Sequence, residues 1–177
     1  MNLDNPNEEL VALSIGSNLG DRIDNINRCI DLLINLELIK DTIRSSFYES
    51  EPISYVLQPK FINIAIIGKT YYSPNDLLFF IKSIEYFLGR VKREKWHERE
   101  IDIDIIFYGN HIIENQYLTI PHKEMINRKF VLLPLAEIDK SLIHPIYNID
   151  IETLLANCKD NSKIKKINVN DTKRNYK

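Results

Sequence analysis

The sequence predicts an α+β domain with a ferredoxin-like β-α-β-β-α-β core, in which a mainly antiparallel sheet with an added hairpin is layered with flanking helices (α-β-α). Strand-like apolar runs alternate with two amphipathic helical patterns in that order. The run 61–67 is apolar on both faces, which indicates a central strand covered by helices on at least one side. No repeat or linker divides the 177 residues, so one domain is expected over residues 1–160.

The first strand is expected over residues 10–15 and is followed by the glycine-bearing turn 16–20. Asp21 is expected to cap the helix that follows. That helix carries an apolar stripe at helical spacing, formed by Ile23, Ile26, Ile30 and Leu33. The turn lacks the Lys-Ser/Thr of a P-loop and the three glycines of a dinucleotide fingerprint, so we favour ordinary turn chemistry over a phosphate loop.

A second strand is predicted over residues 39–48 and a third over residues 60–70, with the proline-bounded loop 50–59 between them. Asn63 interrupts the apolar third strand. Two interpretations of Asn63 stay open: its amide ties down neighbouring backbone, or it recognises a ligand at the face of the sheet.

The second helix is expected to begin at Ser73-Pro74, a cap followed by proline at the first helical position, and to end at Gly89. A strand then continues to Phe107, with residues 111–114 as its predicted hairpin partner across a Gly-Asn turn. Two short helices are expected over 131–138, despite Pro134, and over 151–158. Residues 161–177 are polar and basic, and we predict a mobile or loosely docked tail.

Composition gives the chain no general affinity for polyanions. The net charge of −2 makes no case for nucleic acid or membrane binding, so an anion site would have to be local. Cys29 falls in a helical apolar pattern and is expected in the core, and the N-terminus has no signal-peptide pattern. No apolar run reaches the roughly 20 residues of a spanning helix. We expect a cytoplasmic monomer.

The segment from Gly89 to Asp104 carries the chemistry. In its strand, Asp102 and Asp104 share one face, about 7 Å apart, while Ile101, Ile103, Ile105 and Phe107 are expected on the core face. Such a pair of carboxylates can hold two divalent metal ions. The basic side chains just upstream suit a phosphate ligand, and those cations would bind it. Those cations are Arg90, Lys92, Arg93, Lys95 and Arg99. The alternative is a solvated strand face beside a solvated basic loop.

Two further residues leave alternatives open. Trp96, the only tryptophan, could stack on a nucleobase or a guanidinium, or could anchor the basic loop to the core. Glu85 lies one turn before the end of the second helix. It could contact a ribose or pair with a cation of the loop, or it could lie on an exposed helix face.

Four blocks of the sequence together resemble the 6-hydroxymethyl-7,8-dihydropterin pyrophosphokinase family of folate biosynthesis, over roughly residues 10–147. They are Ile15-Gly16-Ser17-Asn18-Leu19-Gly20; Gln58-Pro59-Lys60-Phe61-Ile62-Asn63; Gly89-Arg90 through Trp96, Arg99 and Asp102-Ile103-Asp104; and Pro121-His122 with Asn127-Arg128 and Phe130. Each block alone is of weak to moderate specificity. Their common order and spacing is highly specific.

The resemblance implies an enzyme that transfers pyrophosphate from ATP to the hydroxymethyl group of the pterin and releases AMP. Asp102 and Asp104 would hold two Mg²⁺ ions against the ATP phosphates, and Arg90 and Arg99 would act on the transferred group. The positions matched around ATP are Glu85, Trp96, Ile105, Thr119, His122 and Arg128. The positions matched to the pterin pocket are Ser50, Glu51, Ile53, Phe61, Asn63, Asp102 and Phe130. Within that pocket, Asn63 would bind the edge of the ring and the two phenylalanines would sandwich it.

The chain departs from the family pattern at a few positions. The segment between Arg90 and Trp96 is one residue shorter than in some members, which leaves open which of Lys92, Arg93 and Lys95 meets phosphate. Lys123 and Ser54 stand where an aromatic residue and a glycine are often seen. Two rival functions are a non-catalytic ferredoxin-like regulatory module and a γ-phosphoryl kinase; the acidic pair beside two arginines argues against the first, and the lack of kinase signatures against the second.

Overall fold

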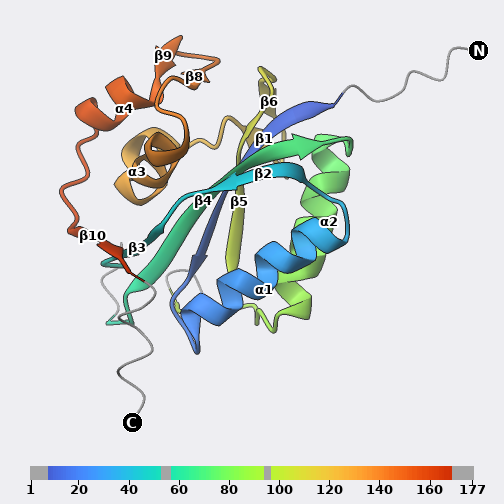
Figure 1. Ribbon diagram of the computed structural model, residues 1–177, viewed down its shortest axis with the longest axis vertical. Coiled ribbons are helices and arrows are strands. Elements are labelled where there is room, and N and C mark those ends of the chain that lie inside the picture. The colour runs from blue at the N-terminus through green and yellow to red at the C-terminus, as the bar shows by residue number, and fades with distance from the viewer. Residues whose placement is uncertain (1–7, 53–56, 94–96, 169–177) are drawn as a thin grey trace, which may run out of the picture.

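The structure is a computed structural model that describes residues 8–52, 57–93 and 97–168. Its centre is a sheet of six strands (Figure 1), namely β1 (Glu9–Ser17), β2 (Lys40–Arg44), β3 (Phe47–Ser50), β4 (Phe61–Thr70), β5 (Asp102–Tyr108) and β10 (Ile164–Ile167). The order across the sheet is β10-β3-β4-β1-β5, with β2 also paired to β4, and all of these pairings are antiparallel. The predicted ferredoxin-like core is confirmed, since β1 and β4 lie at the centre.

Helices cover both faces of this sheet (Figure 1). α1 (Arg22–Asn35) and α2 (Pro74–Phe87) lie on one face, and α3 (Lys129–Ile138) and α4 (Ile151–Asn157) lie on the other. None of the helices in the described part of the chain combines the length and apolar character that a membrane crossing requires.

The alternation of side chains along the strands divides the core in two. Ile62, Ile64 and Ile66 of β4 point to α1 and α2. They share a core cluster with Cys29 of α1, which is fully buried as predicted. Ala65 and Ile67 point to α3 and α4. Each fully buried isoleucine or leucine contributes about 1.5–3 kcal/mol to stability.

Both predicted helix starts are confirmed. Asp21 accepts a hydrogen bond from the main-chain N–H of Asp24 at 3.0 Å, and Ser73 accepts one from Asp76 at 3.2 Å, with Pro74 at the first helical position. These caps satisfy N–H groups that the first turn of a helix leaves without a partner.

The single strand predicted over residues 39–48 is wrong, because a bulge divides it into β2 and β3. Arg44 pairs with Ile66 of β4 but Tyr48 pairs with Asn63, so one extra residue lies between them. Ser45 occupies the break. Its N–H donates to the carbonyl of Ala65, and its hydroxyl accepts from the N–H of the same residue.

A second bulge corrects the predicted face of Phe107. Leu13 of β1 pairs with Ile105, but Ala12 pairs with Phe107, so Ile106 is the extra residue of β5. The bulge reverses the alternation beyond Ile105, and Phe107 therefore packs toward α3 rather than beside Ile105. Asp102 and Asp104 precede the bulge and keep their shared face.

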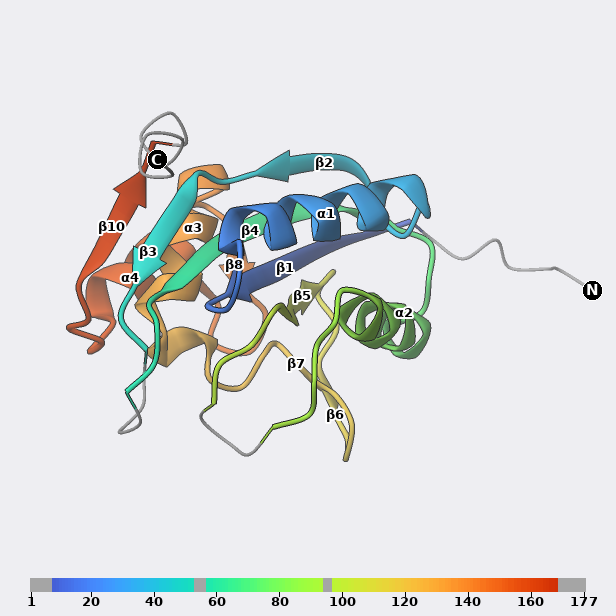
Figure 2. The same ribbon diagram turned by 90° about the horizontal axis from the view of Figure 1, so that it is seen from below.

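The predicted hairpin is wrong in its pairing, because residues 111–114 do not pair with the strand before them. β6 (Ile113–Glu114) pairs with β7 (Thr119–Ile120), and the two form a hairpin separate from the main sheet (Figure 2). Another small hairpin, β8 (Ile143–His144) with β9 (Ile149–Asp150), leads into α4.

The prediction of a mobile tail from residue 161 is wrong for Ile164–Ile167, which form β10 at the edge of the sheet against β3. Glu137 of α3 fixes this edge. Its carboxylate accepts hydrogen bonds from Lys166 at 2.7 Å, from the Tyr48 hydroxyl at 2.8 Å, and from the Ser46 hydroxyl at 2.8 Å. Burial acts to raise the pKa of Glu137, but these donors outweigh it and lower the pKa to about 2.

We expect Glu137→Gln to reduce stability at neutral pH and to flatten its acid dependence. The folded-state pKa lies below the ordinary value of 4.5, so the stabilisation is complete above that value and is lost as pH falls toward 2. The variant should lose about 1–2 kcal/mol near pH 7, after allowance for solvent screening, and little at about pH 2. Urea unfolding across this pH range measures the difference.

Glu152→Gln is the matched control, because Glu152 forms an exposed ion pair with Lys140 at 3.2 Å. It should leave the unfolding curves within about 0.5 kcal/mol of the parent protein. Parallel pH profiles for the parent and Glu137→Gln would contradict the assignment.

Candidate active site

The candidate site lies on the α3 side of the sheet, where the strands change from apolar to polar residues. The register pairs Gly16 with both Asp102 and Asn63, so these three lie in one row across β5, β1 and β4. In the next row Ser14 pairs with Asp104. α3 covers the apolar end of this face, around Ala65 and Phe107, and leaves the polar end open.

A cavity of about 560 Å³ occupies the polar end. Its lining combines acidic, amide, aromatic and basic side chains from the sheet, from the loop before β4, from the basic loop 90–99, and from η1 (Met125–Asn127) and the start of α3. The lining residues are Ser14, Gly16, Ser50, Glu51, Gln58, Phe61, Asn63, His97, Arg99, Asp102, Asp104, Glu124, Asn127, Arg128 and Phe130. Phe61 and Phe130 therefore come from different layers to the same cavity, as a ring sandwich requires.

Gly16 keeps the floor of this cavity open. A Cβ atom at this position would lie 2.9 Å from Oδ1 of Asn63. Asn63 is buried, and its amide donates a hydrogen bond to the Ser50 hydroxyl at 2.9 Å. This partner of the Asn63 amide is therefore a side chain and not the neighbouring backbone considered from the sequence, and Asn63 also lines the cavity.

A second cavity of about 320 Å³ lies beside the first and shares His97 and Arg99 with it. Its lining is rich in cations and includes the end of α2. The charged or titratable residues that line it are Lys82, Glu85, Arg90, Lys92, Arg93, His97, Glu98 and Arg99. A cavity with this excess of positive charge suits an anion such as a phosphate chain.

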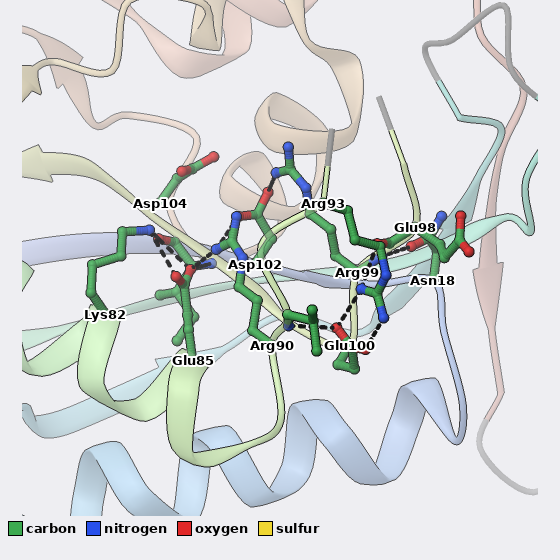
Figure 3. Close-up of polar contacts among 12 residues, drawn as sticks. Asn18, Lys82, Glu85, Arg90, Arg93, Glu98, Arg99, Glu100, Asp102 and Asp104 are labelled. Carbon is green, nitrogen blue, oxygen red and sulfur yellow. Dashed lines mark hydrogen bonds and ion pairs between the residues drawn. The ribbon is translucent and has the colours of Figure 1, made fainter. Parts of the chain in front are cut away.

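A network of charges separates the two cavities (Figure 3). Arg90 contacts both Glu85 and Asp102, the latter at 2.8 Å, and Arg99 pairs with the other oxygen of Asp102. Glu85 is 3 % exposed, which rules out the exposed helix face considered from the sequence. It also accepts hydrogen bonds from Lys82 at 3.0 Å and from the N–H of Ile103 at 2.8 Å. Burial raises the pKa of Glu85, and Lys82 and Arg90 oppose that shift.

Gly89 directs Arg90 into this network. The N–H of Gly89 donates to the carbonyl of Tyr86, and the N–H of Arg90 donates to that of Glu85, the two bonds of a Schellman motif at the end of α2. Gly89 has φ +91°, a conformation that is strained for residues with a Cβ atom. Because of this turn, Arg90 lies directly against Glu85 of the helix that precedes it.

Asp102 and Asp104 satisfy the chemical requirements of a magnesium site. Burial and the neighbouring Asp102 carboxylate raise the pKa of Asp104, whose charged partners are as distant as His122 at 3.8 Å and Arg128 at 3.9 Å. A divalent cation would reverse that shift. The described residues contain no group of three or more His, Cys, Asp or Glu side chains placed as metal ligands. Two neighbouring carboxylates suit Mg²⁺, which commonly takes one or two carboxylates and completes its coordination with phosphate oxygens and water.

Asn18 holds the two loops beside the site together, and its role was missed from the sequence. Its side chain accepts from the N–H of Arg99 at 2.7 Å and donates to Gln58 and to the carbonyl of Pro59. Its own N–H donates to the carbonyl of Arg99 at 3.1 Å. The segments that flank both loops lie at the same end of the sheet (Figure 2). An asparagine in a turn after a strand could have indicated such a role, but its partners lie about 40 and 80 residues away.

The other positions predicted around ATP and the pterin lie in several different surroundings. Ile105 is buried in the core on the α1 and α2 side, so contact with a ligand could come only from its main chain. Thr119 lies in β7 and lines neither cavity. Glu51 lines the larger cavity and pairs with Lys60 at 2.8 Å. Ile53 and Trp96 lie outside the described residues.

We expect two substitutions of Asn18 to separate its contacts. Asn18→Asp keeps the acceptor for the Arg99 N–H but places a carboxylate against the Pro59 carbonyl, whereas Asn18→Ala removes both contacts. Hydrogen exchange of the Arg99 amide should therefore rise roughly five- to tenfold or more in Asn18→Ala and stay near the parent rate in Asn18→Asp. Exchange in peptides covering residues 57–60 should rise in both variants. Equal exchange at Arg99 in the two variants would argue against the assignment.

Comparison with known proteins gives a consistent family. The model of the 7,8-dihydro-6-hydroxymethylpterin-pyrophosphokinase (HPPK) family matches residues 12–140. A 2-amino-4-hydroxy-6-hydroxymethyldihydropteridine pyrophosphokinase of Haemophilus influenzae is 38% identical over 153 residues, covering 86% of this chain and 95% of its own. The protein of the same name from Aquifex aeolicus is 41% identical over 137 residues, covering 77% and 84%.

Solved structures support the fold. The wild-type HPPK-DHPS of Plasmodium falciparum with pteroate matches with a TM-score of 0.65 at 17% identity, over 85% of this chain. The chain spans 42% of that structure's length. An HPPK-DHPS in complex with substrates matches with a TM-score of 0.66 at 16% identity, over 96% of this chain and 45% of the other. From the family model and the relatives that match along most of their length, the chain belongs to the HPPK family.

Proposed function

We propose that this protein transfers the pyrophosphoryl group of ATP to the hydroxymethyl oxygen of 6-hydroxymethyl-7,8-dihydropterin, releases AMP, and so serves folate biosynthesis. The observation that carries this proposal is the meeting of two unlike cavities at Arg99, which lines both and pairs with Asp102 of the larger one. One cavity offers aromatic faces and an amide, and the other offers cations. The family and the relatives described above support the same reaction.

The larger cavity is the proposed pterin site. A flat ring with a polar rim fits between Phe61 and Phe130, with Asn63 at its edge. Ser50 and Glu51 form part of the wall. This arrangement would hold the hydroxymethyl group near Asp102, which lines the same cavity.

The cation-rich cavity is the proposed site of the ATP phosphates, and two Mg²⁺ ions are proposed beside it, held by Asp102 and Asp104 on the wall of the larger cavity. When bound, the ions would offset the negative charge that develops on the phosphate oxygens. Glu85, His122 and Arg128 are proposed contributors on the ATP side. Arg128 and His122 lie within 4 Å of Asp104, which supports their placement near the phosphates.

The two arginines supply the remaining positive charge. The hydroxymethyl oxygen forms a bond to the β-phosphorus, the bond from that phosphorus to the bridging oxygen of AMP breaks, and the hydroxyl proton passes to Asp102 or to water. Arg90 and Arg99 now pair with Asp102. They must exchange that carboxylate for phosphate oxygens to act on the transferred group, which requires the basic loop to move.

One incubation tests the reaction. With ATP, Mg²⁺ and 6-hydroxymethyl-7,8-dihydropterin, we expect AMP and the pyrophosphorylated pterin in equal amounts. Asp104→Asn should reduce turnover by on the order of 100-fold or more, because the second carboxylate for the metal ions is lost. Formation of ADP, no turnover, or an unchanged rate in Asp104→Asn would contradict the proposal.

Gly16→Ala tests the pterin side separately. The new Cβ atom would press on Asn63, so we expect the KM for the pterin to rise roughly tenfold while the KM for ATP changes little. Thermal unfolding of the same variant controls for general destabilisation of β1. An equal rise in both KM values would argue against a pterin site above Gly16.

The remaining expectations are a cytoplasmic monomer that needs no nucleic acid, membrane or protein partner for this reaction. Small-molecule substrates account for the two cavities. Size-exclusion chromatography with light scattering, at the concentration used for the assay, checks the monomer.

A further inference from the structure

The basic loop is closed at its base by one ion pair. Arg93 binds the carboxylate of Glu100 with both terminal nitrogens, at 2.8 Å and 2.5 Å, and also donates to the main-chain carbonyl of Glu98 at 3.1 Å (Figure 3). We call these contacts the Arg93–Glu100 clasp. Its side chains are 27 % and 19 % exposed. A bidentate, partly buried pair of this kind fixes geometry better than an exposed single contact.

The clasp holds the residues on both sides of Arg99. Arg93 binds the main-chain carbonyl of Glu98 and the side-chain carboxylate of Glu100, the two neighbours of Arg99 in the chain. Asn18 holds the N–H and the carbonyl of Arg99 itself. The carbonyl of Glu100 also accepts a hydrogen bond from Asn25 of α1 at 3.0 Å. The backbone of Arg99 is therefore held from within the loop and from the body of the protein.

Arg93 differs from Lys92, its neighbour on the same cavity wall. The guanidinium of Arg93 is engaged by the clasp, and moving it to a phosphate would leave Glu100 unpaired beside the phosphate chain. Lys92 is exposed, lines the cation-rich cavity, and has no ion pair within the described residues.

We propose that Arg93 and Glu100 are positioning residues that set the place of Arg99, and that Lys92, rather than Arg93, is the cation of this pair that meets phosphate. The proposal rests on the proposed function, because it assigns roles within the same site. It leaves Lys95 aside, which lies outside the described residues.

The clasp could instead withhold Arg93 from ATP, and the two roles predict different effects on kcat and on the KM for ATP. If the clasp instead withheld Arg93 from ATP, its removal would release a cation to the phosphates and tighten ATP binding. If the clasp positions Arg99, its removal should lower kcat and leave the KM for ATP nearly unchanged. The sign of the effect therefore separates the two roles.

The test compares Glu100→Gln, Arg93→Gln and Lys92→Gln. We expect Glu100→Gln and Arg93→Gln to lower kcat roughly 10- to 100-fold with the KM for ATP within about twofold, because a misplaced Arg99 acts mainly on the transition state. Hydrogen exchange in peptides covering residues 97–101 should rise in both. Lys92→Gln should instead raise the KM for ATP, without a change in exchange.

Two controls isolate the clasp from net charge. Glu98→Gln makes the same charge change one residue from Arg99 but leaves the clasp, which uses only the main-chain carbonyl of Glu98. Its effect on kcat should be much smaller than that of Glu100→Gln. The double variant Arg93→Glu with Glu100→Arg restores a pair of opposite charges, and its kcat should exceed that of either single change.

Several outcomes overturn the proposal. A lower KM for ATP in Glu100→Gln supports the withholding role, an equal loss in Glu98→Gln supports a charge effect, and a swap no better than the single variants denies the pairing. The activity of the parent protein distinguishes failure of the clasp proposal from failure of the proposed function. If the parent forms no AMP, the proposed function fails; if it forms AMP and Glu100→Gln matches it, only the clasp fails.

Discussion

The register of β1 between β4 and β5 is the constraint on which the site depends. Because Gly16 pairs with Asp102 on one side and Asn63 on the other, a carboxylate, a bare backbone position and an amide lie in one row. A slip of one residue in β5 or in β4 against β1 would turn Asp102 or Asn63 into the core beneath α1 and α2. The isoleucines that alternate with Asp102 and Asn63 along their strands prevent such a slip, since these isoleucines would have to leave that core. The apolar packing of one face thus fixes the polar chemistry of the other.

The burial of charged groups beside the row of Asp102, Gly16 and Asn63 is unfavourable, and neighbouring charges and hydrogen bonds offset it. Glu85 is buried, and a buried carboxylate without partners would be strongly destabilising. Lys82, Arg90 and the N–H of Ile103 supply those partners. The same Arg90 reaches Asp102, so the carboxylate that supports the loop and the carboxylate proposed to hold metal share one guanidinium. A ligand that draws Arg90 away changes the balance at both.

The described ends of the loops around the site are anchored to each other and to the body of the protein. Asn18 joins the two loops, the Schellman turn at Gly89 starts one of them, and the Arg93–Glu100 clasp closes it. Anchors of this kind fix where a loop begins and ends. On the opposite edge of the sheet, Glu137 anchors β10 to α3 and to the bulge between β2 and β3.

The sequence by itself determined the elements whose signals are local. The periodicity of α1 and α2, their caps at Asp21 and Ser73, and the shared face of Asp102 and Asp104 depend only on residues close together in the chain, and all are found in the structure. Four motifs in order were enough to identify the family. The roles assigned to the individual site residues remain proposals, although the structure brings most of them to two adjoining cavities.

Tertiary structure decided what depends on distant partners. The bulge at Ile106 turned Phe107 to the other face, and it exists only in the pairing of β5 with β1. Residues 164–167 of the basic tail form a strand because β3 offers an open edge and Glu137 a partner for Lys166. Asn18 gained its role from residues about 40 and 80 positions away. In the segment 89–104, the sequence indicated a basic loop beside a pair of carboxylates. Folding divided its arginines between Asp102, Glu85 and Glu100, because each guanidinium binds the carboxylate that the fold places within reach.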